Sequence, residues 1–298
     1  MRAAVVITPG EPEAITIIDA PVPQPGADEI RVEVAAAGIN PVDLSTRAGF
    51  FHQLGMIHQA DHVGLGWEVA GTVVDTGSGG DLPLGTRVAG VAVGPDRPLG
   101  TYAEQVVLSA DAVAVVPDGL DLVEAATVPL NGLAAVQALD LLGPAAGRTL
   151  LVTGAAGAVG GYALALAVAA GWSVTGLARP ADEEFVRSTG AAFTTSLSGG
   201  FDAVLDAANL EADAVALVRD GGSYVGMIPA GGPAAERGVT TAAVFTVPDN
   251  GVIADLLART ASGQLPVRVH AVLPLDRATA AHRALATGGV RGRYVLRP

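Results

Sequence analysis

An uncharged segment at residues 149–178 is the feature that most constrains the fold of this chain. Its length and hydropathy match those of a membrane span, but four glycines between residues 154 and 161 interrupt it, and a Gly171-Trp172 break separates a second apolar run. Residues 150–153 predict a strand buried on both faces, and the Ala- and Leu-rich residues from 158 to 170 predict a helix that ends at Gly171. The segment is therefore expected to form a strand, a glycine turn, a helix and a second strand.

A glycine turn between a strand and a helix favours a dinucleotide. Such a turn lets the backbone approach a pyrophosphate and directs the free N–H groups and positive end of the helix toward it. The GxxGxxG spacing differs from the commoner GxGxxG, and glycines in a turn can be simple turn residues, but the flanking strand and helix favour cofactor binding. The predicted cofactor-binding residues here are Gly154, Ala156, Gly157, Ala158, Val159 and Gly160.

The end of the second strand indicates which dinucleotide binds. In such units an acidic residue at this place accepts hydrogen bonds from the ribose hydroxyls of NAD. This chain has Ala178 and Arg179 there, with no carboxylate to repel a 2′-phosphate and a guanidinium able to bind one. We expect NADPH as the cofactor; the alternative is that Arg179 is a solvated loop residue.

Composition and charge narrow the remaining possibilities. The chain has 298 residues, enough for two domains, and a formal net charge of −13, which disfavours nucleic acid and anionic membranes as partners. It has no cysteine, which removes disulfides and thiolate metal sites. The N-terminal apolar run is too short for a signal peptide, so a soluble cytoplasmic protein is expected.

The order of the predicted elements indicates two domains of different class. Residues 1–47 are rich in strands separated by Pro and Gly turns, and residues 30–34 alternate between apolar and charged. After residue 120, strands at 150–153, 173–178, 201–207 and 223–228 alternate with helices, which predicts a doubly wound parallel sheet. Residues 238–247 predict a long edge strand, and residues 251–265 a helix.

Several motifs together resemble the medium-chain dehydrogenase/reductase superfamily. They are GINPVD, GWEVAG, TYAEQVV, EAATVPLNGLAAVQAL and GAAGAVGG, in this order, followed by AHRALATGGVRGRYVL, and they span nearly the whole chain. The resemblance is to the zinc-independent branch with quinone oxidoreductases and enone or enoyl reductases. It implies an α/β fold with a GroES-like β-rich catalytic domain at residues 1–120 and 266–298 and a Rossmann doubly wound parallel sheet at residues 121–265.

The resemblance also bears on metal binding. Zinc-dependent members carry a cysteine where this chain has Asn40 and a histidine where it has Trp67, so we expect no metal site. An alternative is a metal held by His58 and His62, which would share one face of a helix, with Asp61 and Glu68 nearby. No flanking pattern predicts that helix, and loop or substrate-pocket histidines are favoured.

Catalytic and substrate residues are implied by the same resemblance. It places Asn40, Asp43 and Arg47 beside the nicotinamide, Asn40 as a substrate-orienting amide and Arg47 as a charge stabiliser. Alternatively, Asn40 is a turn residue before Pro41, Asp43 caps a short helix, and Arg47 pairs with Asp43. The predicted substrate pocket comprises Ser45, His52 and Trp67; quinone oxidoreductases usually carry a tyrosine where Ser45 stands, which weakens an assignment to quinones.

The remaining cofactor contacts come from the resemblance or from the carboxyl ends of strands, where open α/β sheets bind ligands. The apolar members of the set are equally compatible with plain core positions. The set is Thr127, Asn131, Ala207, Met227, Ile228, Phe245, Thr246 and Arg293.

The resulting hypothesis is an NADPH-dependent oxidoreductase that transfers a hydride to an α,β-unsaturated carbonyl or quinone without zinc. The alternatives are a tailoring reductase of secondary metabolism on the same fold and a non-catalytic NADPH-binding sensor or structural protein. Because the predicted edge strand at 238–247 is nearly uncharged and β-branched, a homodimer is expected to cover it.

Overall fold

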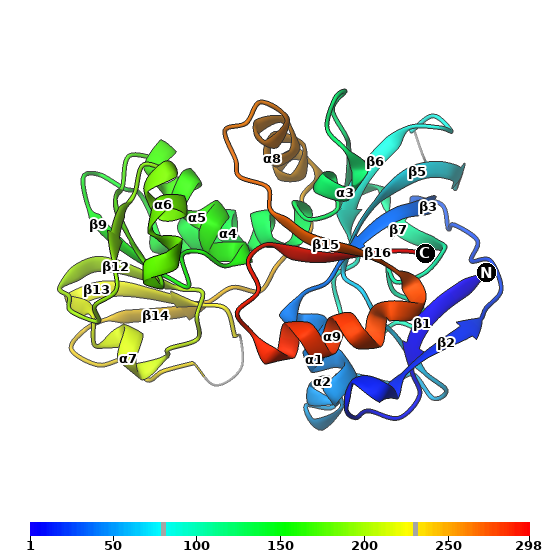
Figure 1. Ribbon diagram of the computed structural model, residues 1–298, viewed down its shortest axis with the longest axis horizontal. Helices are drawn as coiled ribbons and strands as arrows, with labels where there is room; N and C mark the ends of the chain where they lie inside the picture. Colours follow the sequence, from blue (N-terminus) through cyan, green and yellow to red (C-terminus); the bar gives the residue numbers. More distant parts are fainter. Residues whose placement is uncertain (79–81, 229–231) are drawn as a thin grey trace. The chain divides into compact units, whose positions relative to one another are not determined.

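The computed structural model describes residues 1–78, 82–228 and 232–298. The chain divides into two compact units (Figure 1). Unit 1 comprises Met1–Leu130, Pro248–Ser262 and Val267–Pro298, and unit 2 comprises Asn131–Val247 and Gly263–Pro266.

Unit 1 is the β-rich part of the chain. Its larger sheet has the strand order β15-β16-β3-β5-β6-β8, with β7 also paired to β3, and its smaller sheet the order β2-β1-β4. The strands are β1 (Arg2–Val6), β2 (Ile15–Asp19), β3 (Glu29–Gly38), β4 (Val63–Gly64), β5 (Glu68–Thr76), β6 (Arg87–Val91), β7 (Gln105–Ser109), β8 (Val113–Val115), β15 (Val269–Pro274) and β16 (Arg293–Arg297). The helices are α1 (Pro41–Ala48), α2 (Phe50–Gln53), α3 (Leu122–Ala125), α8 (Asn250–Ala261) and α9 (Ala278–Thr287).

Strand β3 organises the core of unit 1. Ile30, Val32 and Val34 are buried while Glu33 between them is exposed, as the alternating sequence predicts. The antiparallel register pairs Gly38 with Glu68, so the residues just after β3 and just before β5 lie at the same edge of the sheet. This register positions the polar residues of the candidate site.

Unit 2 is a parallel sheet in the order β11-β10-β9-β12-β13-β14. With β9 as the first strand, this is the 3-2-1-4-5-6 order of a doubly wound dinucleotide-binding fold. The strands are β9 (Thr149–Thr153), β10 (Ser173–Leu177), β11 (Ala192–Thr194), β12 (Phe201–Asp206), β13 (Val218–Gly226) and β14 (Thr240–Ala243). The helices are α5 (Ala158–Ala169), α6 (Glu183–Ser188) and α7 (Ala212–Val215), and α4 (Pro129–Leu142) leads into the unit from residue 129.

Helices cover both faces of this sheet. Figure 1 shows α5 and α6 on one side and α7 on the other. Leu151 and Val204 of the central strands pack with Ala214 and Val215 of α7. The chain is therefore an α/β protein with a β-rich unit and a doubly wound sheet, as predicted.

Two predicted elements differ in extent. The strand expected at 238–247 lies at the edge of the sheet, but β14 covers only Thr240–Ala243. The helix expected at 251–265 is α8, which ends at Ala261 and contacts β6 and β8 of unit 1. The domain boundaries near residues 120 and 265 remain a prediction.

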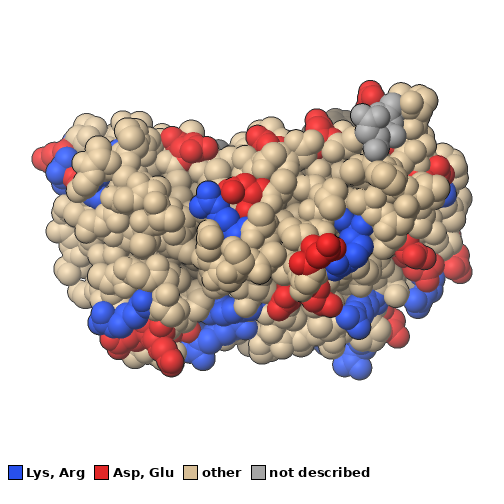
Figure 2. Space-filling model, turned by 90° about the horizontal axis from the view of Figure 1, so that it is seen from above, with Lys and Arg blue, Asp and Glu red and all other residues tan. Residues whose placement is uncertain are grey.

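The surface is mixed in charge on the face that Figure 2 shows, where acidic and basic side chains are interspersed. Within the described residues, no helix has the length and hydropathy needed to cross a bilayer.

Candidate active site

The glycine turn lies between β9 and α5 and is built by close backbone approaches. Gly154 has φ +57, and a Cβ added there would lie 2.9 Å from the carbonyl oxygen of Ala207. A Cβ at Gly160 would overlap the carbonyl oxygen of Gly154 and lie 2.9 Å from Ala155 Cα. Both positions therefore require glycine, which brings Ala207, after β12, against the turn.

Helix α5 begins after a glycine, which has no side chain to cap it. Its N-cap is Gly157, which makes no side-chain capping bond, and the first amides of a helix have no intrahelical acceptor. Ala158, Val159 and Gly160 supply these amides. A helix start of this kind can accept a phosphate group.

Ala178 and Arg179 directly follow β10, the neighbour of β9 in the sheet. Arg179 is exposed and is the N-cap of the short 3₁₀ turn Pro180–Asp182. Arg179 is therefore at the carboxyl edge of the sheet, where the sequence predicts a 2′-phosphate.

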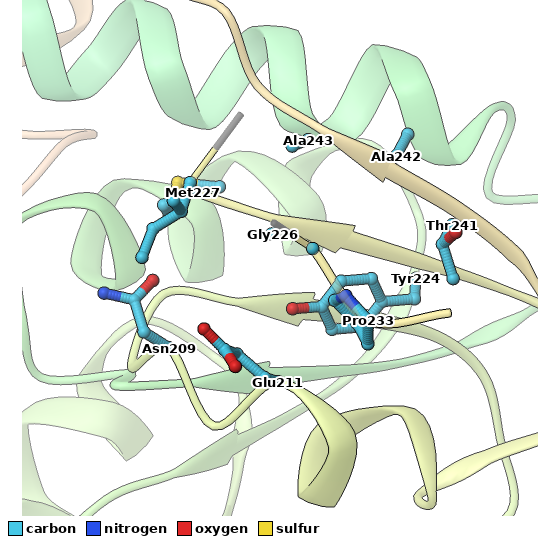
Figure 3. Close-up of a pocket in the computed structure, with 11 residues that line it drawn as sticks. Asn209, Glu211, Tyr224, Gly226, Met227, Pro233, Thr241, Ala242 and Ala243 are labelled. Atoms are coloured by element: carbon cyan, nitrogen blue, oxygen red, sulfur yellow. The ribbon is translucent and has the colours of Figure 1, made fainter. Parts of the chain in front are cut away.

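A pocket of about 190 Å³ lies at the carboxyl ends of β12, β13 and β14. Met227, a predicted cofactor-binding residue, lines it together with Asn209, Glu211 and Tyr224 (Figure 3). Ile228, also predicted to bind the cofactor, lines it too. The buried Asp206 fixes this edge, because its carboxylate accepts hydrogen bonds from Thr153 Oγ1 at 2.5 Å, Tyr224 Oη at 3.0 Å and Glu211 N at 2.8 Å. Burial and the charge of Asp206 raise the pKa of the Tyr224 hydroxyl.

The other predicted cofactor residues are dispersed. Phe245 is 64% exposed in the segment after β14, with the half-buried Thr246 beside it. Asn131 is buried in α4, and Thr127, in unit 1, donates from Oγ1 to Glu124 O at 2.8 Å.

In unit 1, a buried carboxylate links segments that are far apart in the sequence. Glu68 Oε1 accepts hydrogen bonds from Asn40 Nδ2 at 2.8 Å and from Arg293 Nη2, and Glu68 Oε2 accepts from Leu130 N at 3.1 Å. Arg293 Nη2 also donates to Asn40 Oδ1 at 2.5 Å. The structure thus brings two predicted site residues, Asn40 and Arg293, together around Glu68.

Asp43 is fully buried in the first turn of α1. Its Oδ2 accepts hydrogen bonds from Asn40 N at 2.7 Å and Tyr102 Oη at 2.9 Å, and its Oδ1 accepts from Gly66 N at 3.1 Å. The bond to Asn40 N caps the helix, which is the alternative weighed from the sequence. Burial, partly offset by these donors, raises the pKa of Asp43 to about 7.

Arg47 lies in the last turn of α1 and is only 6% exposed. Among the described residues its Nε and Nη1 have no hydrogen-bond partner, and it forms no ion pair with Asp43. Burial lowers the pKa of Arg47, while the charge of Glu11 opposes this shift. Burial and, to a lesser extent, the charge of Arg47 lower the pKa of His282 on α9 to about 3, so this core histidine is neutral.

The three predicted pocket residues are on or near α1 and α2. Ser45 Oγ donates to Pro41 O at 3.3 Å, and His52 is half-buried on α2. Trp67, 8% exposed, stacks on Phe51 with ring centroids 6.1 Å apart, and Arg97 Cζ lies 5.8 Å from its ring centroid. Whether these residues contact a substrate remains a prediction.

The donor set does not fit a catalytic zinc. Trp67 has no lone pair to offer, and Asn40 is engaged by Glu68 and Arg293. Residues 58–62 are not helical, and His58 Nδ1 instead pairs with Asp96 at 2.9 Å. In the described ranges, no group of three or more His, Asp or Glu side chains is arranged for a metal.

Two family models match the chain. The model for the alcohol dehydrogenase GroES-like domain matches residues 26–118, and that for zinc-binding dehydrogenases matches residues 179–296. The 2-methylene-furan-3-one reductase of Solanum lycopersicum is 30% identical over 300 residues, covering 93% of this chain and 74% of the relative. The chain belongs to the medium-chain dehydrogenase/reductase superfamily. It is therefore an oxidoreductase, with the GroES-like and Rossmann parts predicted from the sequence.

Other members of the medium-chain dehydrogenase/reductase superfamily are similar over most of the chain. The chloroplastic NADPH-dependent alkenal/one oxidoreductase of Arabidopsis thaliana is 30% identical over 299 residues, covering 93% of this chain and 74% of the relative. The solved structure of the quinone oxidoreductase from Coxiella burnetii has a TM-score of 0.88 at 26% identity and covers 100% of this chain and 99% of its own.

Sequence reasoning missed several residues of this medium-chain dehydrogenase/reductase. Tyr102 and Glu68 stand inside the recognised motifs TYAEQVV and GWEVAG, but only the folded register shows that they hold Asp43 and Asn40. No motif contains Arg97, Asn209 or Glu211. A lone charged residue in a loop gives no signal before its neighbours are known.

Proposed function

We propose that this protein is a reductase that uses NADPH to reduce the conjugated double bond of an α,β-unsaturated carbonyl or a quinone. The main support is the glycine turn, whose helix start after Gly157 lies on the same sheet edge as Arg179. The names of its relatives, an alkenal/one oxidoreductase and a furanone reductase, fit the same chemistry.

The cofactor contributes the redox chemistry, since bound NADPH supplies a hydride. The chain supplies binding and orientation. Ala158, Val159 and Gly160 would donate backbone N–H groups to the pyrophosphate, and Arg179 would pair with the 2′-phosphate. Met227 and Ile228 would form an apolar wall beside the cofactor, in the pocket that Asp206 holds in shape.

Residues of unit 1 would orient the substrate. Glu68 and Arg293 fix both ends of the Asn40 amide, so this side chain keeps one orientation. Asp43 positions Asn40 N and Gly66 N, and we assign it a positioning role. Hydride addition to one alkene carbon is completed by a proton, from solvent or a bound water, on the other. Homodimer formation and a cytoplasmic location remain part of this proposal.

The test is a fluorescence titration of wild type and Arg179→Ala with NADPH and with NADH. Loss of a charged contact to phosphate costs about 1.5–3 kcal/mol, so the affinity of the variant for NADPH should fall about tenfold or more. Its affinity for NADH, which lacks the 2′-phosphate, should stay the same. The control is Arg187→Ala, an exposed arginine of α6 that pairs with Glu183 at 2.8 Å.

NADPH oxidation is then measured with a panel of enones, enals and quinones as acceptors. Saturable NADPH binding with oxidation of no acceptor would contradict the reductase and favour a sensor. Failure to bind either nucleotide would contradict the cofactor assignment itself.

A further inference from the structure

Trp67 and Arg97 form a polar and aromatic wall at the start of β5. The indole is 8% exposed and stacks on Phe51 of α2, with an interplanar angle of 27°. Arg97 Cζ lies 5.8 Å from the indole centroid, close enough for a cation–π contact.

Hydrogen bonds of Arg97 and of the residue before it hold Arg97 in position. Its Nη2 donates to Gly66 O at 3.2 Å, one residue before Trp67. The preceding residue, Asp96, accepts hydrogen bonds from His58 N at 2.9 Å and Gln59 N at 3.2 Å. These hydrogen bonds from the loop lower the pKa of Asp96 to about 2, so it stays ionised and keeps the loop against Arg97.

The wall has unused hydrogen-bonding capacity. Trp67 Nε1, Arg97 Nε and His52 Nδ1 are all buried and lack a hydrogen-bond partner within the described chain. Buried polar atoms are normally paired, because each unpaired one costs free energy. Two of these three atoms are obligatory donors, which an acceptor-rich group would satisfy.

The charge of Arg97 is also incompletely balanced. Burial lowers its pKa to about 10, and the favourable charge that opposes this shift is that of Asp43. Asp43 has a pKa of about 7, so near neutral pH it supplies only part of a negative charge. An anion beside Arg97 would supply the missing part.

We propose that Arg97 and Trp67 bind a carboxylate of the substrate, so that the conjugated carbonyl reduced by this protein is an unsaturated keto acid. The planar guanidinium matches a carboxylate through its Nε–Nη2 edge, and Trp67 Nε1 adds one donor. Phe51 and Trp67 would contact the conjugated carbons. This inference rests on the proposed function, which makes the substrate a conjugated carbonyl compound. Arg97 would give the preference for an acid.

The test compares two acceptors of nearly equal shape, (E)-4-oxopent-2-enoate and (E)-hex-3-ene-2,5-dione. The first has a carboxylate where the second has an acetyl group. Wild type should show a kcat/KM at least tenfold higher for the acid. In Arg97→Gln this ratio should fall at least tenfold, and Arg97→Lys, which keeps the charge without the planar edge, should lie between the two.

The control is Arg31→Gln. Arg31 is also half-buried, its Nε has no hydrogen-bond partner among the described residues, and it donates to a backbone oxygen, Pro23 O, at 3.3 Å, while its Nη2 pairs with Asp75 at 2.9 Å. It lies near the start of β3, away from the end of the strand where Gly38 pairs with Glu68. Its replacement should leave the ratio between the two acceptors unchanged. Equal kcat/KM values for the two acceptors in wild type, or an unchanged ratio in Arg97→Gln, would overturn the inference.

A binding measurement separates this inference from the proposed function. The chain has two tryptophans, so a Trp172→Phe background reports Trp67 fluorescence alone. Titration with the saturated acid 4-oxopentanoate should change this fluorescence saturably, and Arg97→Gln should abolish the change. That result supports the carboxylate site even if no acceptor oxidises NADPH, whereas no change in a folded Trp172→Phe protein contradicts it.

Discussion

Asp43 is a carboxyl group without solvent contact, and three donors surround it. Burial raises its pKa to about 7 in the folded chain, from 3.8 in the unfolded chain. Between pH 3.8 and about 7, Asp43 is therefore protonated in the folded state and ionised in the unfolded state. The contribution of Asp43 to stability falls as pH rises through this window.

Tyr102→Phe tests this linkage. The hydrogen bond from the Tyr102 hydroxyl lowers the pKa of Asp43, so loss of this bond raises that pKa further. The fall in folding stability with rising pH then continues above pH 7. We expect a cost of about 1 kcal/mol at pH 5, where Asp43 is mostly protonated, and about 2 kcal/mol at pH 8.5, where a charged acceptor loses its donor. Urea unfolding at both pH values measures the difference.

A matched control is Tyr294→Phe, because the Tyr294 hydroxyl has no hydrogen-bond partner among the described residues and its ring contact with His270 is kept. Its free energy of unfolding should change by less than about 0.5 kcal/mol at either pH. An equal cost of Tyr102→Phe at both pH values would show that Asp43 does not titrate in this range.

At the scale of elements, the β9–α5 turn allows the sharpest prediction. A methyl group at residue 160 would meet backbone atoms of Gly154 and Ala155, which cannot move without displacing the turn. Gly160→Ala should therefore weaken NADPH binding about tenfold or more and destabilise the protein by about 1–3 kcal/mol. Nicotinamide fluorescence and chemical unfolding measure the two effects.

Gly10→Ala is the control for this substitution, because among the described residues an added Cβ there meets only Ala14 Cβ, at 3.6 Å. It should leave nucleotide affinity unchanged. Normal NADPH affinity in Gly160→Ala would mean that the turn does not contact the cofactor.

Elements defined by local patterns could be predicted, and those that depend on distant partners could not. The glycine turn, the alternation of β3 and the strands of the parallel sheet follow from residues adjacent in sequence. The edge strand was predicted too long, because β-branched residues after Ala243 favour a strand while β14 ends where its pairing with Gly226 ends. Propensity alone does not reveal where a neighbouring strand stops.

The same limit applies to the candidate site. Arg293 contacts Asn40 and Glu68 across sequence separations of 253 and 225 residues. The sequence resemblance indicated Asn40 and Arg293 separately, but only the folded register shows that Glu68 joins them. Arg97 stood in no motif, so its position over Trp67 could not be predicted.

At the scale of the whole molecule, the predicted homodimer can be tested directly. The edge strand β14 is followed by Phe245 and Val247, which are 64% and 56% exposed. Burial of such side chains and of a strand edge favours association. Light scattering at micromolar concentration should give twice the chain mass of 29.6 kDa, and Phe245→Lys should shift the protein toward the monomer. A wild-type monomer under these conditions would contradict the prediction.

The buried contact between Glu68 and Arg293 has a consequence for synthesis on the ribosome. Glu68 is made early, but its cationic partner lies on β16, which is translated after all of unit 2. Until residue 293 emerges, the Glu68 carboxylate lacks its cationic partner. We therefore expect closure of the core of unit 1 around Glu68 to be unfavourable before that point. Unit 2, whose segments lie within residues 131–266, is free to fold first, so the part of the chain that begins earliest is the part that finishes last.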